Sequence, residues 1–141
     1  MELKRKKPSF KIYGTKYKTK DGTCIRDYIH IKDICSAIEK SIFYLKKKKS
    51  LIINIGSGEG ISNKNVLLTL AKILNKKIKI SLLKKRKGDQ PVLVCSIYKA
   101  KKILKWRPRF SKIENILKSE INWSNFLIKK NITRKYISVQ K

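Results

Sequence analysis

The sequence predicts one small α/β or α+β domain, and three observations support this prediction. Short apolar runs of strand length alternate with longer segments whose apolar residues recur at helical spacing. Turns that contain glycine or proline separate these segments. The length of 141 residues suffices for one domain with its own core, but not for two domains of ordinary size.

The first part of the chain predicts two strands and a helix. Phe10 to Tyr13 has the length and composition of a strand, and the polar segment after it contains an Asp21-Gly22 turn. Asp27 to Ile31 is predicted as the second strand. Apolar residues then recur at helical spacing from Ile34 to Leu45, which predicts an amphipathic helix with Asp33 as its N-cap.

The middle of the chain predicts a buried strand and a second helix. Leu51 to Ile55 is a continuous apolar run with the length of a buried strand. A glycine-rich turn follows from Gly56 to Gly60. Ser62 is then predicted to cap a helix that extends to Leu74 with its apolar side chains on one face.

The last part of the chain predicts a strand, a loop and two helices. Ile78 to Leu82 is predicted as a strand, and Lys84 to Pro91 as an exposed loop. Ser96 is expected to cap a short helix, which must end before Pro108 because the residue before proline disfavours helical geometry. A final helix is predicted from Ser111 to Lys129. We expect residues 1–9 to form a basic N-terminal segment, residues 10–129 the folded domain and residues 130–141 a basic C-terminal tail.

The charge of the chain is strongly positive. It contains 37 Lys and Arg against 9 Asp and Glu, which gives a formal net charge of +28. A small basic nucleic-acid-binding protein is therefore one alternative, although such proteins usually gather their basic residues on one face around a recognisable module. Here 31 Lys and 6 Arg are spread over the whole sequence. We therefore interpret the high lysine content as compositional drift in a chain that keeps an ordinary fold. We expect no specific binding of nucleic acid.

Cysteine and histidine usage argues against a disulfide framework and a metal site. The 3 Cys show no CxxC spacing, their odd number cannot close into pairs, and the single His leaves no zinc constellation. No apolar run approaches the length of a membrane span, which is about 18 residues. The basic start of the chain lacks the apolar stretch of a signal peptide. We expect a cytoplasmic protein with no metal and no membrane contact.

Two patterns typical of NAD-dependent enzymes occur only in part. The turn from Gly56 to Gly60 reads GxGxG rather than GxGxxG, and the next predicted strand ends without an acidic residue for a ribose. Tyr-x-x-x-Lys pairs begin at Tyr28, Tyr44 and Tyr98, but the abundance of Lys makes them weak indications. We therefore assign this chain no catalytic and no cofactor-binding residues.

Arg26 and the loop from Lys84 to Asp89 are the candidate phosphate-binding features. Arg26 is one of few arginines in a lysine-rich chain, and a planar guanidinium binds phosphate with two parallel donors. In the loop, the Gly88-Asp89 turn can place a carboxylate, a natural acceptor for ribose hydroxyls, beside Arg86. The simpler alternative for both features is a surface cation. His30 is expected to be packed or hydrogen-bonded rather than catalytic.

Several motifs together resemble a known family. The run from Asp21 to Asp33, DGTCIRDYIHIKD, is long and specific, and Ile12-Tyr13-Gly14 precedes it. The motifs NIGSG, RKGD and LKWRP follow in the same order and spacing as in that family. From about Phe10 to Phe126 the chain resembles the C-terminal part of UDP-glucose 4-epimerase, an extended short-chain dehydrogenase/reductase.

This resemblance implies a small substrate-binding portion with defined roles. Arg26 and Arg86 would bind the diphosphate of UDP, and Asp89 would bind the uridine ribose. Leu93 would lie beside the sugar, where family members vary between bulky and small side chains, so acceptance of N-acetylated sugars is left open. The residues that would line the uracil are Lys11, Ile12 and Tyr13.

The resemblance also implies what this sequence lacks. In the family, the NAD-binding glycine loop and the catalytic Tyr and Lys lie in an N-terminal Rossmann portion that has no counterpart here. We expect NAD in the complete family enzyme, which interconverts UDP-glucose and UDP-galactose in galactose metabolism, and an inactive chain without that portion. The chain would be a truncated or split product. It is either one part of a two-chain enzyme, with UDP-sugar and a separate Rossmann chain as partners, or a remnant without function.

Overall fold

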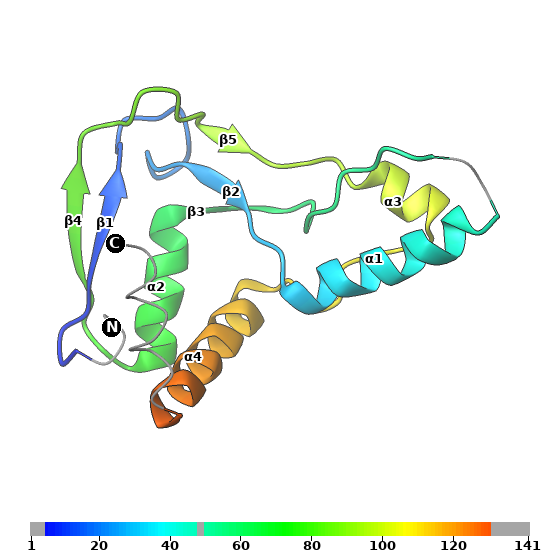
Figure 1. Cartoon of the computed structure of the whole chain (residues 1–141). Coiled ribbons are helices and arrows are strands. Elements are labelled where there is room, and N and C mark those ends of the chain that lie inside the picture. Colours follow the sequence, from blue (N-terminus) through cyan, green and yellow to red (C-terminus); the bar gives the residue numbers. More distant parts are fainter. Residues whose placement is uncertain (1–4, 48–49, 131–141) are drawn as a thin grey trace.

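The computed structural model describes residues 5–47 and 50–130 (Figure 1). Helices and strands are mixed along these residues, which confirms the predicted α/β (α+β) class. Most of the basic tail expected at residues 130–141, and part of the basic segment expected at residues 1–9, lie outside the described residues. The elements are β1 (Ser9–Tyr13), β2 (Ile25–Asp27), α1 (Ile31–Leu45), β3 (Gly60–Ser62), α2 (Asn63–Leu74), β4 (Lys79–Leu83), β5 (Val92–Leu93), α3 (Tyr98–Ile103) and α4 (Ile113–Lys129).

Two small sheets organise the described residues. β1 pairs with β4 in parallel, while β2 lies between β3, which is antiparallel to it, and β5, which is parallel. Figure 1 shows β1 and β4 side by side with α2 next to them, and α2 packs against α4. Because β1 and β4 are parallel, their carboxyl ends meet at one edge, from which the loop between β4 and β5 departs.

Several predicted elements are confirmed. β1 begins at Ser9, one residue before its predicted start, and ends at Tyr13 as predicted. α2 matches its predicted range, and the Ser62 hydroxyl accepts a hydrogen bond from the Asn65 amide at 3.2 Å, as expected of an N-cap. β4 begins and ends one residue later than predicted. α4 begins at Ile113 rather than Ser111 and ends at Lys129.

The predicted start of α1 is wrong. The predicted strand from Asp27 to Ile31 is also wrong, because β2 ends at Asp27 and Ile31 already begins the helix. His30 rather than Asp33 caps the helix: its Nδ1 accepts from the Lys32 amide at 3.0 Å. Asp33 lies in the first turn, where its carboxylate accepts from the amides of Arg109 (2.8 Å) and Phe110 (2.9 Å). Asp33 thus joins α1 to a distant segment. A sequence motif cannot reveal this partner, because capping rules describe only neighbouring residues.

Two further predictions are wrong. Leu51 to Ile55 forms no strand in the structure. α3 has Ile97 at its N-cap position with no side-chain cap, and the predicted cap Ser96 only accepts a long contact of 3.4 Å from the Tyr98 amide. The short strand β5 lies in a segment with no predicted element, because two residues are too few to form a pattern.

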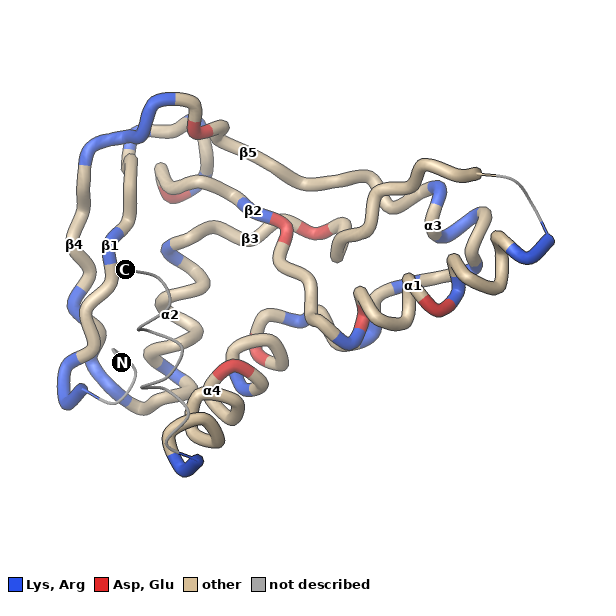
Figure 2. The backbone as a smooth tube through the Cα atoms, in the orientation of Figure 1, with Lys and Arg blue, Asp and Glu red and all other residues tan. Residues whose placement is uncertain are grey.

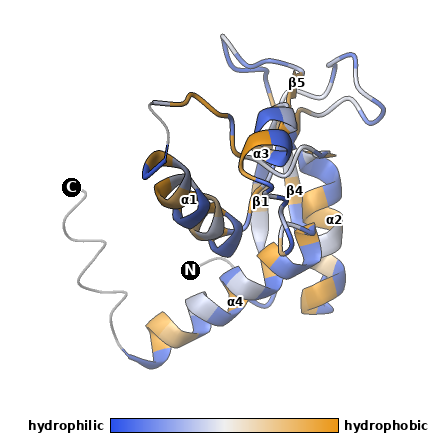
Figure 3. Cartoon of the chain, turned by 90° about the vertical axis from the view of Figure 1, so that its right-hand side faces the viewer, coloured by the Kyte–Doolittle hydropathy of each residue, from blue (hydrophilic) through white to orange (hydrophobic). Residues whose placement is uncertain are grey.

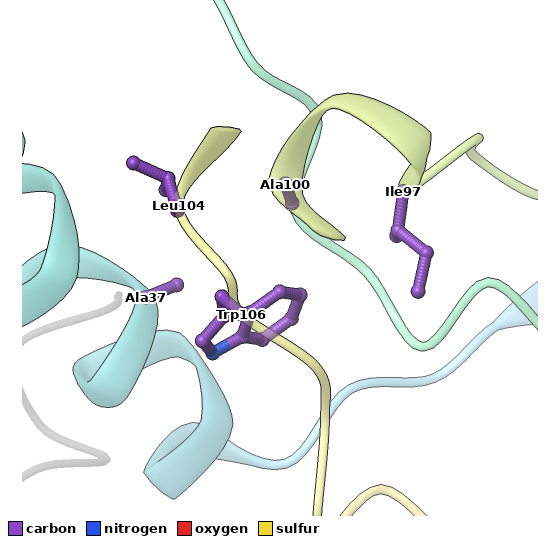
Figure 4. Packing of buried hydrophobic residues seen from close by; sticks show 5 residues of the cluster. All are labelled: Ala37, Ile97, Ala100, Leu104 and Trp106. Atoms are coloured by element: carbon purple, nitrogen blue, oxygen red, sulfur yellow. The ribbon is translucent and has the colours of Figure 1, made fainter. Parts of the chain in front are cut away.

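The main core cluster lies between α1 and α3. Figure 4 shows the Trp106 ring between the two helices, and its Nε1 donates to the Ser36 hydroxyl at 2.8 Å. The buried members of the cluster are Ala37, Ile97, Ala100, Leu104 and Trp106. This cluster is small for a domain, and many large apolar side chains lie exposed elsewhere.

Charge is dispersed over the described residues. Figure 2 shows Lys and Arg on most elements, with a run of them in the loop between β4 and β5. No helix among these residues has the length and hydropathy needed to span a membrane.

Candidate functional site

The end of β1 and the loop after β4 meet in one contact. The guanidinium carbon of Arg86 lies 3.5 Å from the centroid of the Tyr13 ring, which is the distance of a close cation–π stack. The hydrogen bond from Arg86 lowers the pKa of Tyr13. Lys11 is exposed on the same strand, whereas the side chain of Ile12 is buried. Only the backbone of Ile12 is therefore available to a ligand.

A second contact joins β2 to the end of the same loop. The Arg26 Nη2 lies 3.6 Å from the Asp89 Oδ1, and Arg26 Nη1 donates to the Gln90 carbonyl at 2.8 Å. Arg26 is also the register partner of Leu93 across β2 and β5, so the exposed Leu93 side chain lies beside this contact. The loop between β4 and β5 is thus held at both ends, by Arg86 on Tyr13 and by Arg26 on Asp89.

The segment between β1 and β2 contacts the loop between β4 and β5 through Tyr17. Gly14 has a φ of 78°, and a side chain there would collide with the Tyr17 ring. Lys85 Nζ lies 4.9 Å from the centroid of the Tyr17 ring, and burial raises the pKa of Tyr17 to about 12. An open cavity of about 360 Å³ lies at this place, at the carboxyl ends of β1 and β4. Its lining residues are Gly14, Thr15, Lys16, Tyr17, Leu82, Leu83, Lys84 and Lys85.

Asp27, the last residue of β2, binds the glycine turn through its carboxylate. Its carboxylate accepts from the Ser57 amide at 2.7 Å, the Gly58 amide at 3.3 Å and the Cys95 amide at 3.3 Å, and the Ser57 hydroxyl also donates to it. Burial would raise the pKa of Asp27, but these hydrogen bonds outweigh it and hold the pKa below its usual value. A side chain at Gly56 would collide with Asp27 and Cys95, so this glycine serves close packing.

The glycine turn does not fit NAD. A dinucleotide-binding turn offers free backbone amides to the pyrophosphate, but the amides of Ser57 and Gly58 already donate to the Asp27 carboxylate. The amides of this turn are therefore not free to bind a pyrophosphate.

The Tyr-x-x-x-Lys pairs form no catalytic arrangement among the described residues. The Tyr28 hydroxyl donates to Asn63 at 3.0 Å, and burial raises the pKa of Tyr28. The Lys102 Nζ lies over the face of the Tyr98 ring, 5.6 Å from its centroid. The third pair includes Lys48, which lies outside the described residues. His30 is buried and hydrogen-bonded, which confirms its predicted role.

The structure brings together most of the residues assigned to the substrate. Tyr13 and Arg86 contact each other, as do Arg26 and Asp89, and Leu93 pairs with Arg26 in the sheet. Both contacts involve the loop between β4 and β5, and two guanidinium groups, an aromatic ring and a carboxylate are the groups that suit a ligand with a diphosphate, a base and a sugar. Sequence reasoning missed two supporting residues. Asp27 lies in the motif that carries the resemblance and holds the glycine turn, and the carbonyl of Gln90 accepts from Arg26.

Curated relatives of this chain are UDP-glucose 4-epimerases. The enzyme of Lacticaseibacillus casei is 39% identical over 113 residues, which are 79% of this chain and 34% of that protein. The enzyme of Rhizobium meliloti is 35% identical over 119 residues, which are 84% of this chain and 36% of that protein. No family model matches the chain.

Solved structures agree with these relatives. The UDP-Glc/GlcNAc 4-epimerase of Campylobacter jejuni is 38% identical with a TM-score of 0.76, over 83% of this chain and 36% of that one. The UDP-glucose 4-epimerase of Bifidobacterium longum, solved with NAD+ and UDP, is 30% identical with a TM-score of 0.77, over 86% and 35%.

The chain spans only about a third of the length of the relatives it matches. None of the similarities described above supports the alternative of a nucleic-acid-binding protein. Its sequence and its fold agree over the same portion. By both, the chain is similar to the C-terminal portion of UDP-glucose 4-epimerases.

Proposed function

We propose that this chain binds the UDP part of a UDP-sugar, as the substrate-binding portion of a UDP-glucose 4-epimerase. The observation that carries the proposal is the convergence of Arg26, Arg86, Tyr13 and Asp89 on the loop between β4 and β5. The relatives named above are epimerases of UDP-sugars, and one of them was solved with UDP.

In this proposal the two arginines bind the diphosphate. The Arg26 guanidinium is oriented by its hydrogen bonds to the carbonyls of Ile25 and Gln90, both 2.8 Å, and keeps Nη2 toward the Asp89 carboxylate. Arg86 is exposed and stacked on Tyr13, so it can turn toward a phosphate without breaking a buried contact. Asp89 then accepts from the hydroxyls of the ribose.

The base is proposed to lie along β1. This strand pairs with β4 on one edge, and the sheet of the described residues has no strand on its other edge. Backbone groups from Lys11 to Tyr13 are therefore available to the polar edge of uracil, while the Tyr13 ring offers a face for stacking. Leu93, exposed beside Arg26, faces the sugar in this arrangement, and acceptance of an N-acetylated sugar depends on its size.

Epimerisation is proposed to need a further portion. Removal of a hydride from the sugar requires a nicotinamide and a base, and among the described residues we assign neither an NAD site nor a catalytic Tyr–Lys pair. The chain would contribute to the interconversion of UDP-glucose and UDP-galactose, in galactose metabolism, only together with an NAD-binding Rossmann portion. The three free cysteines are consistent with the cytoplasm.

Calorimetric titration of the purified chain with UDP and with ADP tests the proposal. The two ligands carry the same diphosphate, so a diffuse basic surface would bind both equally, whereas contacts of β1 with the base favour UDP. We expect UDP to bind more tightly than ADP. Equal affinities, or no binding of UDP, would refute the proposal. In a parallel assay with NAD and UDP-galactose, we expect no turnover by the chain alone.

A further inference from the structure

Arg86 occupies a place that the proposed function assigns to a base. Its guanidinium carbon lies 3.5 Å from the centroid of the Tyr13 ring, which is van der Waals contact with the face of that ring. A base that stacks on this face would need the same space, so the base and the guanidinium cannot share it. This face of the Tyr13 ring can therefore receive a base only after the guanidinium has left it.

The contact between Arg86 and Tyr13 is weaker than the contacts that a diphosphate offers. The Arg86 side chain is exposed, and among the described residues no carboxylate forms an ion pair with it; Asp89 pairs with Arg26 instead. A cation–π contact at an exposed site is weaker than a charge-assisted hydrogen bond between a guanidinium and a phosphate. A diphosphate beside the loop between β4 and β5 therefore attracts Arg86 away from the ring.

The two arginines differ in how firmly they are held. Arg26 donates to the carbonyls of Ile25 and Gln90, both at 2.8 Å, and its side chain is only 26% exposed. By contrast, the exposed side chain of Arg86 lies on a ring from which it can rotate. Arg26 therefore offers a fixed contact to a diphosphate, whereas Arg86 reaches the diphosphate only by leaving Tyr13.

The backbone of the loop between β4 and β5 is held while the Arg86 side chain turns. Lys85 Nζ lies 4.9 Å from the centroid of the Tyr17 ring, and Arg26 holds the other end of the loop by its ion pair with Asp89. Figure 3 colours this loop, at the top of the view, mostly as hydrophilic, which is typical of a segment that faces solvent. The movement therefore needs only the rotation of one exposed side chain.

We propose that Arg86 couples the binding of the two parts of UDP. The diphosphate attracts the guanidinium away from Tyr13, and the ring face that is uncovered in this way then stacks with uracil. By linkage, each part of the ligand increases the affinity for the other by the same factor. Arg86 thereby determines specificity, because a nucleoside without phosphates must displace the guanidinium and gains no phosphate contact in exchange. This inference rests on the proposed function, which assigns the diphosphate to the arginines and the base to β1.

Uridine and pyrophosphate, used as separate ligands, test the coupling. Uridine carries no charge, so pyrophosphate neither attracts nor repels it directly. Carbon NMR of labelled tyrosine follows the Tyr13 ring while the whole chain is titrated with uridine, and the loss of a signal in Tyr13→Phe assigns it. We expect saturating pyrophosphate to increase the affinity for uridine about fivefold, which corresponds to the cation–π contact that must break. An unchanged affinity, or no detectable binding of uridine in the presence of pyrophosphate, overturns the proposal.

Two variants of the loop separate the coupling from a general effect of charge. Arg86→Ala uncovers the Tyr13 ring, so it should bind uridine alone about fivefold more tightly than the parent chain, although it binds UDP more weakly. Pyrophosphate should then have no effect on its affinity for uridine. Lys84→Ala removes a neighbouring charge outside the contact with Tyr13 and should keep the coupling of the parent chain. The proposal is wrong if Arg86→Ala binds uridine no more tightly than the parent, or if Lys84→Ala loses the coupling.

Titration with UDP and with ADP distinguishes this inference from the proposed function. A preference for UDP over ADP, together with independent binding of uridine and pyrophosphate, would refute the coupling alone. Equal affinities for UDP and ADP would refute the proposed function, and the coupling with it.

Discussion

The guanidinium of Arg86 is stacked on the ring of Tyr13, with the Arg86 carbon 3.5 Å from the ring centroid. The contact joins the carboxyl end of β1 to the loop that follows β4. It holds a cation for phosphate next to an aromatic face for a base. Both groups are accessible from outside, and this is the arrangement on which the proposed function depends.

Replacement of Arg86 by Lys should weaken UDP binding nearly as much as its replacement by Ala. A guanidinium presents two parallel donors to a phosphate, whereas an ammonium group of the same charge does not. We expect a loss of about tenfold to a hundredfold for either variant. Calorimetric titration with UDP measures it, with Lys84→Ala as the matched control. If Arg86→Lys binds like the parent, or if Lys84→Ala is equally damaging, the loop acts only as a diffuse cationic surface.

The phenol of Tyr13 should titrate at a lower pH than an ordinary tyrosine, because the hydrogen bond from Arg86 favours its ionised form. Arg86→Ala should return the pKa of Tyr13 to about 10. Carbon NMR of labelled tyrosine followed over alkaline pH resolves this titration. Lys85→Ala, which removes the cation over Tyr17, is the control and should leave the Tyr13 pKa in place. An identical titration in Arg86→Ala and the parent would contradict the stacked geometry.

Loss of the Asp33 carboxylate should strongly destabilise the chain. Asp33 is almost fully buried and accepts from the amides of Arg109 and Phe110 and from the Ser111 hydroxyl at 2.6 Å. Asp33→Ala leaves these donors unpaired and is expected to lower the free energy of unfolding by about 3 kcal/mol. Urea unfolding followed by circular dichroism measures the change. Glu39→Ala, an exposed acid on the same helix, should change it by less than about 0.5 kcal/mol.

Stability should fall in acid. The pKa values of Asp21, Asp27 and Asp33 are all lowered in the folded chain, because their hydrogen bonds outweigh the effect of burial. Lowered values mean that these carboxyls contribute their full stability above the unfolded pKa of about 3.9, and that it is lost as the pH falls through the folded values. Urea midpoints measured from pH 7 to pH 2 should therefore stay level and then drop below about pH 4. Asp27→Asn should show a smaller drop, and a midpoint that rises in acid would exclude this explanation.

The sequence alone determined the elements whose signals are local. The strand β1 and the helix α2 with its cap at Ser62 were predictable because their apolar spacing and capping bonds involve residues a few positions apart. The specific run from Asp21 to Asp33 also sufficed to relate the chain to the C-terminal portion of UDP-glucose 4-epimerases. The candidate arginines Arg26 and Arg86 could be selected from their scarcity among lysines.

Only the tertiary structure decided which residues meet across long stretches of chain. It assigned Asp33 to the amides of Arg109 and Phe110 instead of a helix cap, and Asp27 to the glycine turn. It also left Leu51 to Ile55 without a sheet. The physical reason is common to all three: a carboxylate accepts from any buried donor that the fold brings near, and an apolar run becomes a strand only where another strand offers it hydrogen bonds.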